Sequence, residues 1–122
     1  MKNLTLAGKT AVVTGGASGI GAAIVEFFVE LGATVASFDL RPGGASHGAA
    51  HEFLGDVTSE KDTLAATQGA IEAMGGVDIL VNSAGISDTY LPTTEQTVAS
   101  WQRIVDVDLT GTYLMCKAAG PH

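Results

Sequence analysis

Short apolar runs alternate with longer segments of helical period along this chain. The apolar runs contain β-branched residues and end in glycine or polar residues, a pattern typical of strands covered on both faces, as in a parallel sheet. Helical segments between such strands predict an α/β fold. The expected strands are Lys9–Thr14, Thr34–Phe38 (ending on Asp39), Glu52–Gly55 and Val77–Val81.

Two helices are expected between these strands. The first covers Gly19–Leu31 and ends at Gly32, and the second begins at Thr58 or Ser59 and ends at Gly75-Gly76. Asp62 lies three positions after Ser59, the spacing of a capping box. The helical period places one apolar stripe of the first helix on Ile20, Ile24, Phe27, Phe28 and Leu31, and the inward face of the second on Leu64, Ala65, Gln68, Ile71 and Met74.

The last third of the chain gives two conflicting patterns. Thr89–Thr97 is polar and predicts an exposed loop. Val105–Thr110 alternates apolar and polar residues, which by period alone predicts a strand. The wider segment also follows helical offsets, with Ser100 as a possible N-cap; the residues concerned are Trp101, Ile104, Val105, Asp108, Thr112, Met115 and Cys116.

Composition limits the class of protein. A length of 122 residues suits one domain, and 46% hydrophobic against 16% charged residues is typical of a globular chain. The net charge of −7 disfavours nucleic acid and anionic membrane surfaces as partners. No apolar run reaches the length of a membrane span, and the first residues do not resemble a secretory signal. We therefore expect a cytoplasmic protein.

The cysteine and histidines carry no evident chemistry. A single cysteine, Cys116, excludes an internal disulfide, and we expect it to be a small buried residue. His47 and His51 lie in or beside a glycine-rich loop without other residues at metal-ligand spacing, so we expect surface histidines and no metal site.

The stretch Thr14-Gly15-Gly16-Ala17-Ser18-Gly19-Ile20-Gly21 carries the strongest chemical signal. It follows a predicted strand and opens a predicted helix, the order required for a dinucleotide site. Glycines let the backbone approach a pyrophosphate, and the helix N-terminus offers unpaired N–H groups and a positive dipole end. The alternative is a flexible loop in a glycine-rich chain.

Two acidic residues follow later predicted strands. Asp39 lies eighteen positions after Gly21, close to the spacing at which a carboxylate binds the adenosine ribose hydroxyls. Its charge would repel a 2′-phosphate, so Asp39 favours NAD over NADP, and we interpret nearby Arg41 as solvated surface. Asp39 could instead be an ordinary strand-end acid, and Asp56 an acid that initiates the next helix.

The glycine loop, Asp39, Asp56-Val57 and Asn82-Ser83-Ala84-Gly85 occur in the order found in the classical short-chain dehydrogenase/reductase family, which this chain resembles over nearly its whole length. Ser83 departs from that family's Asn-Asn-Ala-Gly. The resemblance implies a Rossmann-like doubly wound parallel sheet with strand order 3-2-1-4, and it favours a helix for the last segment through a similar W-x-x-x-x-x-V-N-L-x-G pattern. Residues 1–122 are then the N-terminal part of one dinucleotide-binding domain, truncated after the fourth strand and its helices.

The resemblance also implies an activity, hydride transfer between NAD(H) and an alcohol or carbonyl substrate whose identity stays open. It implies a homo-oligomer. In the family, Asp56 and Val57 would contact adenine, and the backbone of the Asn82 segment would line the ribose. The implied cofactor-binding residues are Gly15, Ser18, Gly19, Ile20, Gly21, Asp39, Leu40, Asp56, Val57, Asn82, Ser83, Ala84 and Gly85.

The family's catalytic residues are an Asn, a Ser and a Tyr-x-x-x-Lys pair. Asp108 stands at the position of the Asn, where a carboxylate adds a charge and removes a donor. Tyr113 and Lys117 have the Tyr-x-x-x-Lys spacing but lie one element too early, and Tyr90 has no Lys four residues on. We therefore expect the catalytic half to be absent and the chain alone to be an inactive part of an NAD-dependent oxidoreductase. The alternative is an NAD-binding module or pseudoenzyme without turnover.

Overall fold

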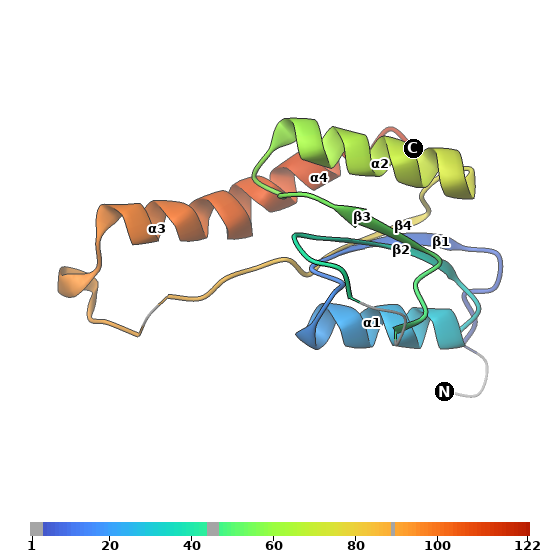
Figure 1. Cartoon of the computed structure of the whole chain (residues 1–122), viewed down its shortest axis with the longest axis horizontal. Coiled ribbons are helices and arrows are strands. Elements are labelled where there is room, and N and C mark those ends of the chain that lie inside the picture. The colour runs from blue at the N-terminus through green and yellow to red at the C-terminus, as the bar shows by residue number, and fades with distance from the viewer. Residues whose placement is uncertain (1–3, 44–46, 89) are drawn as a thin grey trace.

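The chain folds around a four-stranded parallel sheet with helices on both faces (Figure 1). The computed structural model describes residues 4–43, 47–88 and 90–122. The strands follow the order β3-β2-β1-β4, with β1 paired to both β2 and β4. The elements are β1 Thr10–Thr14, α1 Gly19–Glu30, β2 Thr34–Asp39, β3 His51–Leu54, α2 Glu60–Met74, β4 Ile79–Asn82, the 3-10 turn η2 Thr93–Glu95, α3 Val98–Ile104, the π-helical segment η3 Val105–Thr110 and α4 Gly111–Ala119. The predicted doubly wound fold and strand order are confirmed.

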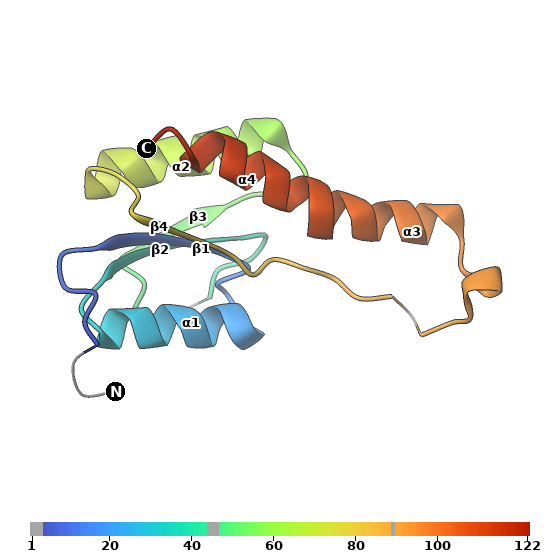
Figure 2. The same cartoon turned by 180° about the vertical axis from the view of Figure 1, so that it is seen from behind.

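Each face of the sheet has its own core. Figures 1 and 2 show α1 on one face and α2 with α4 on the other. Side chains alternate along a strand, so Val12 of β1 packs toward α2 and α4 while Val13 packs toward α1. Burial on both faces explains why the strand sequences are almost continuously apolar.

Three predicted helix ends are confirmed by their caps. Gly32 follows α1 with φ of +98°, and Gly75 follows α2 with φ of +86°, both in the left-handed region that glycine tolerates. At the start of α2, the Ser59 hydroxyl accepts a hydrogen bond from the Asp62 N–H at 3.1 Å. These local signals therefore set the helix boundaries.

The predicted inward faces of α1 and α2 were wrong in part. On α1, Ile20 is 77% exposed and Phe27 is 42% exposed, while Gly21 and Val25 are buried. On α2, Leu64, Ala65 and Gln68 are exposed, and the buried residues are Thr63, Ala66, Thr67 and Ala70. Small side chains let a helix approach a neighbouring element closely, whereas the prediction had favoured large apolar ones.

The last segment is helical. α3, η3 and α4 form one continuous rod whose α3 end projects beyond the sheet (Figure 1). Within η3, the Gly111 N–H donates to the Asp106 carbonyl, five residues back, which widens the helix locally. The N-cap is Thr97 and not Ser100, since the Thr97 hydroxyl accepts from the Ser100 N–H at 3.0 Å.

Two predictions about single residues were wrong. His47 is buried, with its Nδ1 accepting from the Ala49 N–H and its Nε2 lying 3.4 Å from Glu52 Oε1. His51 is half-buried. Cys116 is exposed, and its sulfur accepts from the Asn82 side-chain amide at 3.7 Å. The exposure of both residues depends on tertiary packing, which the local sequence does not show.

In the described part of the chain, no helix has the length and apolar character needed to cross a membrane.

Asp78 joins the start of β4 to the start of β1. Its carboxylate accepts from the Thr10 backbone N–H at 2.9 Å, and its own N–H donates to the Thr10 hydroxyl at 3.1 Å. The pKa of Asp78 lies below its ordinary value, chiefly because the Thr10 N–H stabilises the ionised carboxylate. The ionised form is therefore the one that supports the sheet.

We expect Asp78→Ala to lower the melting temperature at neutral pH. A carboxyl whose folded pKa is depressed stabilises the fold above its unfolded pKa and loses that effect as the pH falls through the folded value. The difference between wild type and variant should therefore shrink as the pH falls below about 4. Thermal melts followed by circular dichroism measure this, with Glu26→Ala, an exposed acid on α1, as the control. A difference independent of pH would contradict the assignment.

Candidate functional site

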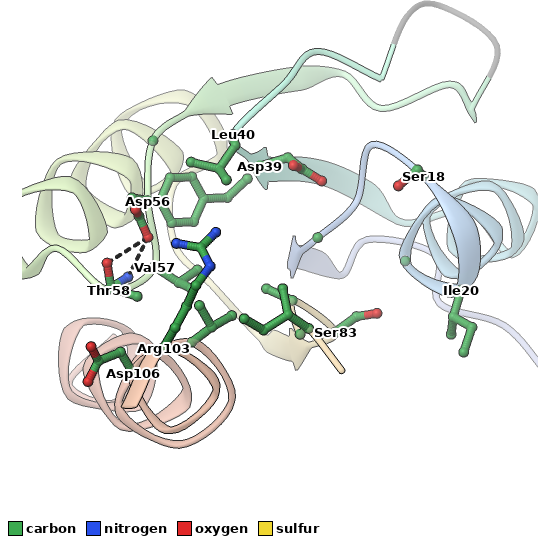
Figure 3. A pocket seen from close by; sticks show the side chains of 18 of the residues that line it. Ser18, Ile20, Asp39, Leu40, Asp56, Val57, Thr58, Ser83, Arg103 and Asp106 are labelled. Atoms are coloured by element: carbon green, nitrogen blue, oxygen red, sulfur yellow. Dashed lines mark hydrogen bonds between the residues drawn. The ribbon is translucent and has the colours of Figure 1, made fainter. Parts of the chain in front are cut away.

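A pocket of about 720 Å³ opens at the carboxyl ends of the strands, beyond the paired ends of β1 and β4 (Figure 3). In parallel sheets, the crevice at this reversal of strand order is the usual ligand site. Of the thirteen residues that the sequence singles out as cofactor contacts, all but Gly19 and Asn82 line it. They are Gly15, Ser18, Ile20, Gly21, Asp39, Leu40, Asp56, Val57, Ser83, Ala84 and Gly85.

The glycine loop leaves no room for a side chain at Gly15 or Gly21. Gly15 has φ of +64°, and a Cβ there would lie 2.8 Å from the Ala84 Cα. A Cβ on Gly21 would overlap the Gly15 carbonyl oxygen. Glycine at both positions is therefore required for the loop to pack against the segment after β4 and for α1 to begin directly beneath it.

The N-terminus of α1 faces the pocket without a charge of its own. Its N-cap residue Ser18 makes no side-chain capping bond, and the first turn contains no acidic residue. Ser18, Ile20 and Gly21 line the cavity, with Ile20 exposed at its rim. A helix N-terminus of this kind favours an anion, since unpaired N–H groups and the positive dipole end point at it.

Asp39 is held at the end of β2 by two backbone donors. Its Oδ2 accepts from the Ala17 N–H at 3.0 Å, and its Oδ1 accepts from the Arg41 N–H at 3.4 Å. The first bond ties the carboxylate to the glycine loop. Each oxygen keeps a lone pair for a further donor, such as a hydroxyl group in the pocket. The Arg41 side chain is exposed and does not line the pocket.

Asp56 presents one carboxylate oxygen with local partners and one without. Both the N–H and the hydroxyl of Thr58 donate to its Oδ1, at 2.9 and 2.8 Å (Figure 3). In the described part of the chain, Oδ2 has no donor. Asp56 is therefore a turn-forming acid before α2, and its cofactor contact stays a prediction.

The segment after β4 is fixed to β1 by one hydroxyl. The buried Thr14 Oγ1 accepts from the N–H groups of Ser83 and Ala84, each at 3.1 Å. These are backbone contacts, so serine at position 83 does not disturb them. The Asn82 side chain instead reaches Cys116 of α4, away from the cavity.

Five pocket residues on the rod were missed by the sequence reasoning: Ala99, Gln102, Arg103, Asp106 and Val107. Their offsets of three, four, seven and eight residues form one helical face. This helical period is visible in the sequence, but the segment could also be read as a strand, so the face was not identified. The other missed lining residues flank predicted ones: Phe38, Gly55, Thr58 and Ile86.

Among the described residues, no group of three or more His, Cys, Asp or Glu could hold a metal ion.

Comparison with known proteins agrees with this geometry. The family model for short chain dehydrogenase matches residues 9–122. D-threitol dehydrogenase from Mycolicibacterium smegmatis is 40% identical over 94% of this chain and 47% of its own length. The chain belongs to the short-chain dehydrogenase family. Glucose 1-dehydrogenase 2 from Bacillus subtilis is 37% identical over 96% of this chain and 49% of its own.

Solved structures agree as well. A 3-ketoacyl-(acyl-carrier-protein) reductase from Brucella melitensis, complexed with NADH, superimposes with a TM-score of 0.91 at 35% identity, covering 97% of this chain and 51% of that one. The chain thus spans about half the length of the curated relatives it matches. Short-chain dehydrogenases bind a nicotinamide cofactor, and the pocket described above has a suitable volume and a loop in which Gly15 and Gly21 have no room for a Cβ.

Asp108, at the position of the short-chain dehydrogenase Asn, lies within η3 beside the pocket. Its Oδ1 accepts from the Ile86 N–H at 2.8 Å, which links the rod to the segment after β4. This bond needs an acceptor, which Asp and Asn both provide. Asp108 itself does not line the cavity, and its catalytic role stays a prediction.

The Tyr113–Lys117 pair lies away from the pocket. Tyr113 is exposed on α4, and Lys117 donates to Glu60 of α2 at 3.2 Å. That carboxylate raises the pKa of Lys117. Because neither residue is among those lining the cavity, their position supports the view that the spacing is coincidental.

We expect Thr14→Val to destabilise the fold by about 1–3 kcal/mol, since the near-isosteric side chain leaves two N–H groups without their acceptor. Thr14→Ser keeps the hydroxyl and is the matched control. Its free energy of unfolding should fall by less than that of Thr14→Val. Urea unfolding of the three proteins measures the difference. Equal stabilities of the Val and Ser variants would show that the hydroxyl does not hold the two strand ends together.

Proposed function

We propose that this chain is the cofactor-binding part of an NAD-dependent oxidoreductase, acting on an alcohol or carbonyl substrate. The single observation that carries the proposal is the placement of Asp39 and the α1 N-terminus around one pocket. A dinucleotide needs both an anion site and a hydroxyl acceptor, and these two features supply them. When bound, the nicotinamide group would accept or give a hydride.

Each part of the pocket corresponds to one part of NAD. The glycine loop and the α1 N-terminus suit the pyrophosphate, and Asp39 suits the adenosine ribose hydroxyls. The free Oδ2 of Asp56 suits the amino group of adenine, with Val57 beside it. The positions of Ser83, Ala84 and Gly85 support contacts to the rest of the cofactor.

Asp39 also supports a preference for NAD over NADP. A 2′-phosphate at the ribose would meet a carboxylate that the Ala17 N–H already orients toward this side of the loop. The exposed Arg41 contributes its backbone N–H to Asp39, and its side chain lies outside the pocket lining. Repulsion without a compensating cation disfavours the phosphorylated cofactor.

We expect wild-type chain to bind NAD about 10- to 100-fold more tightly than NADP, a difference of about 1.4–2.8 kcal/mol. Asp39→Asn keeps an acceptor for the Ala17 N–H but removes the charge, so this ratio should fall most of the way to one. Asp39→Ala should weaken NAD binding itself by about tenfold or more. Isothermal titration calorimetry with NAD and with NADP measures these affinities, with Glu30→Ala as the control. An unchanged ratio in Asp39→Asn would refute the role given to the charge.

For residues 1–122 alone, we propose binding without turnover. The described residues bring no tyrosine hydroxyl to the pocket, since Tyr113 lies on the exposed side of α4 and Tyr90 is 88% exposed outside the lining. A carbonyl reduction needs such a group to supply the proton. A pure NAD-binding module is the second candidate, favoured by this same observation.

We expect the purified 122-residue chain to form no NADH from NAD and a secondary alcohol above the rate without protein. The absorbance of NADH measures the reaction. If NADH forms, the Tyr113→Phe variant tests whether the Tyr113 hydroxyl is needed for it. Turnover that disappears in Tyr113→Phe would show that the Tyr113–Lys117 pair is catalytic after all.

Self-association is also proposed. The rod exposes Trp101, Leu109 and Tyr113, and exposed apolar side chains gathered on one element favour a protein contact. The homo-oligomer and the cytoplasmic location both stay predictions.

A further inference from the structure

Arg103 is the one cation among the described residues that line the pocket. Three carboxylates, those of Asp39, Asp56 and Asp106, share that lining. An arginine in such surroundings normally pairs with an acid, yet no carboxylate of the described residues lies within 4.0 Å of its guanidinium. The exposed side chain is therefore available to something that enters the cavity.

The neighbouring acid on the rod is already engaged. Asp106, three residues after Arg103, accepts from the Gln102 side-chain amide at 2.7 Å. Figure 3 shows the Asp106 carboxylate turned away from the cavity while the Arg103 guanidinium points into it. Val107, one helical turn further along, lines the same wall. Arg103 and Val107 thus present a planar cation and an apolar surface on one helix face.

The guanidinium lies at the end of the pocket proposed for adenine and not at the end proposed for the phosphates. In Figure 3 it is on the side of Asp56 and Leu40, across the cavity from Ser18 and the start of α1. The walls near it are mostly apolar, with Leu40, Val57 and Val107. A flat aromatic base fits between such walls, and a guanidinium stacks well on its face.

We propose that Arg103 stacks on the adenine of the bound dinucleotide and closes that end of the site. The inference rests on the proposed function, since it requires a dinucleotide in the pocket. Asp56 then binds the edge of the base through Oδ2, while Arg103 covers its face. The rod thereby contributes affinity to a site whose other contacts come from the strand ends.

The test compares Arg103→Ala, Arg103→Lys and wild type by calorimetric or competition binding of adenosine, AMP and NAD. Stacking predicts that Arg103→Ala weakens all three ligands by a similar factor, about 3- to 30-fold. Arg103→Lys should restore little, because lysine keeps the charge but lacks the plane. The factor should also persist at raised salt, since adenosine is neutral. Arg41→Ala removes the chain's other arginine, outside the pocket, and should change nothing.

Other results would overturn the inference. If Arg103→Ala lowered the affinity for AMP and NAD but not for adenosine, Arg103 would contact a phosphate and not the base. Full recovery of affinity in Arg103→Lys would lead to the same conclusion. NADP is titrated alongside, and a loss of affinity confined to NADP would assign Arg103 to a 2′-phosphate. Unchanged or tighter binding in Arg103→Ala would exclude any attractive contact. If Asp39→Ala weakens NAD while Arg103→Ala does not, only this inference fails; if wild type binds no ligand, the proposed site fails with it.

Discussion

The site depends on how closely two strand ends can approach each other. The Thr14 hydroxyl at the end of β1 holds the Ser83 and Ala84 N–H groups after β4, and Gly15 then passes Ala84 with no space for a Cβ. This contact fixes the glycine loop relative to the segment after β4. The start of α1, the position of Asp39 through Ala17, and the floor of the cavity all follow from it.

The chain orders its polar groups by using backbone atoms as partners. Asp39, Asp78 and Asp108 each accept a backbone N–H from another part of the site or sheet, and Asp56 accepts one from Thr58 in its own turn. These bonds orient each carboxylate while leaving lone pairs for a ligand at Asp39 and Asp56. Although the chain has a net charge of −7, the N-terminus of α1 contributes no acid of its own, so this end of the pocket favours an anion.

The strands and helix ends could be predicted from the sequence because their signals are local, whereas the strand order followed from the family resemblance. Apolar runs located every strand, and Gly32, Ser59 and Gly75 set helix ends through their own backbone and side-chain chemistry. Which helix face is buried was less predictable. On α2, close packing selected Ala66 and Ala70 over Leu64, and that choice depends on the distance between elements.

The difference between local signals and tertiary packing also applies to the pocket. The pocket residues on the loops after β1, β2 and β4 follow from motif and strand order, so their place in the pocket could be predicted. Arg103 and Val107 could not, because they reach the pocket from a rod whose helical state was in doubt. His47 is buried beside Gly43, which no local pattern indicates.

The most direct test of the account is a nuclear magnetic resonance titration of the isotope-labelled 122-residue chain with NAD. We expect the largest amide shifts at Gly15, Ser18, Asp39, Val57 and Ala84, the residues that surround the cavity from the ends of all four strands. Amides on the far side of α2 should not move. Saturable shifts confined to these positions would support the site and the cofactor together. Shifts elsewhere, or none at millimolar NAD in a folded chain, would contradict the central claim.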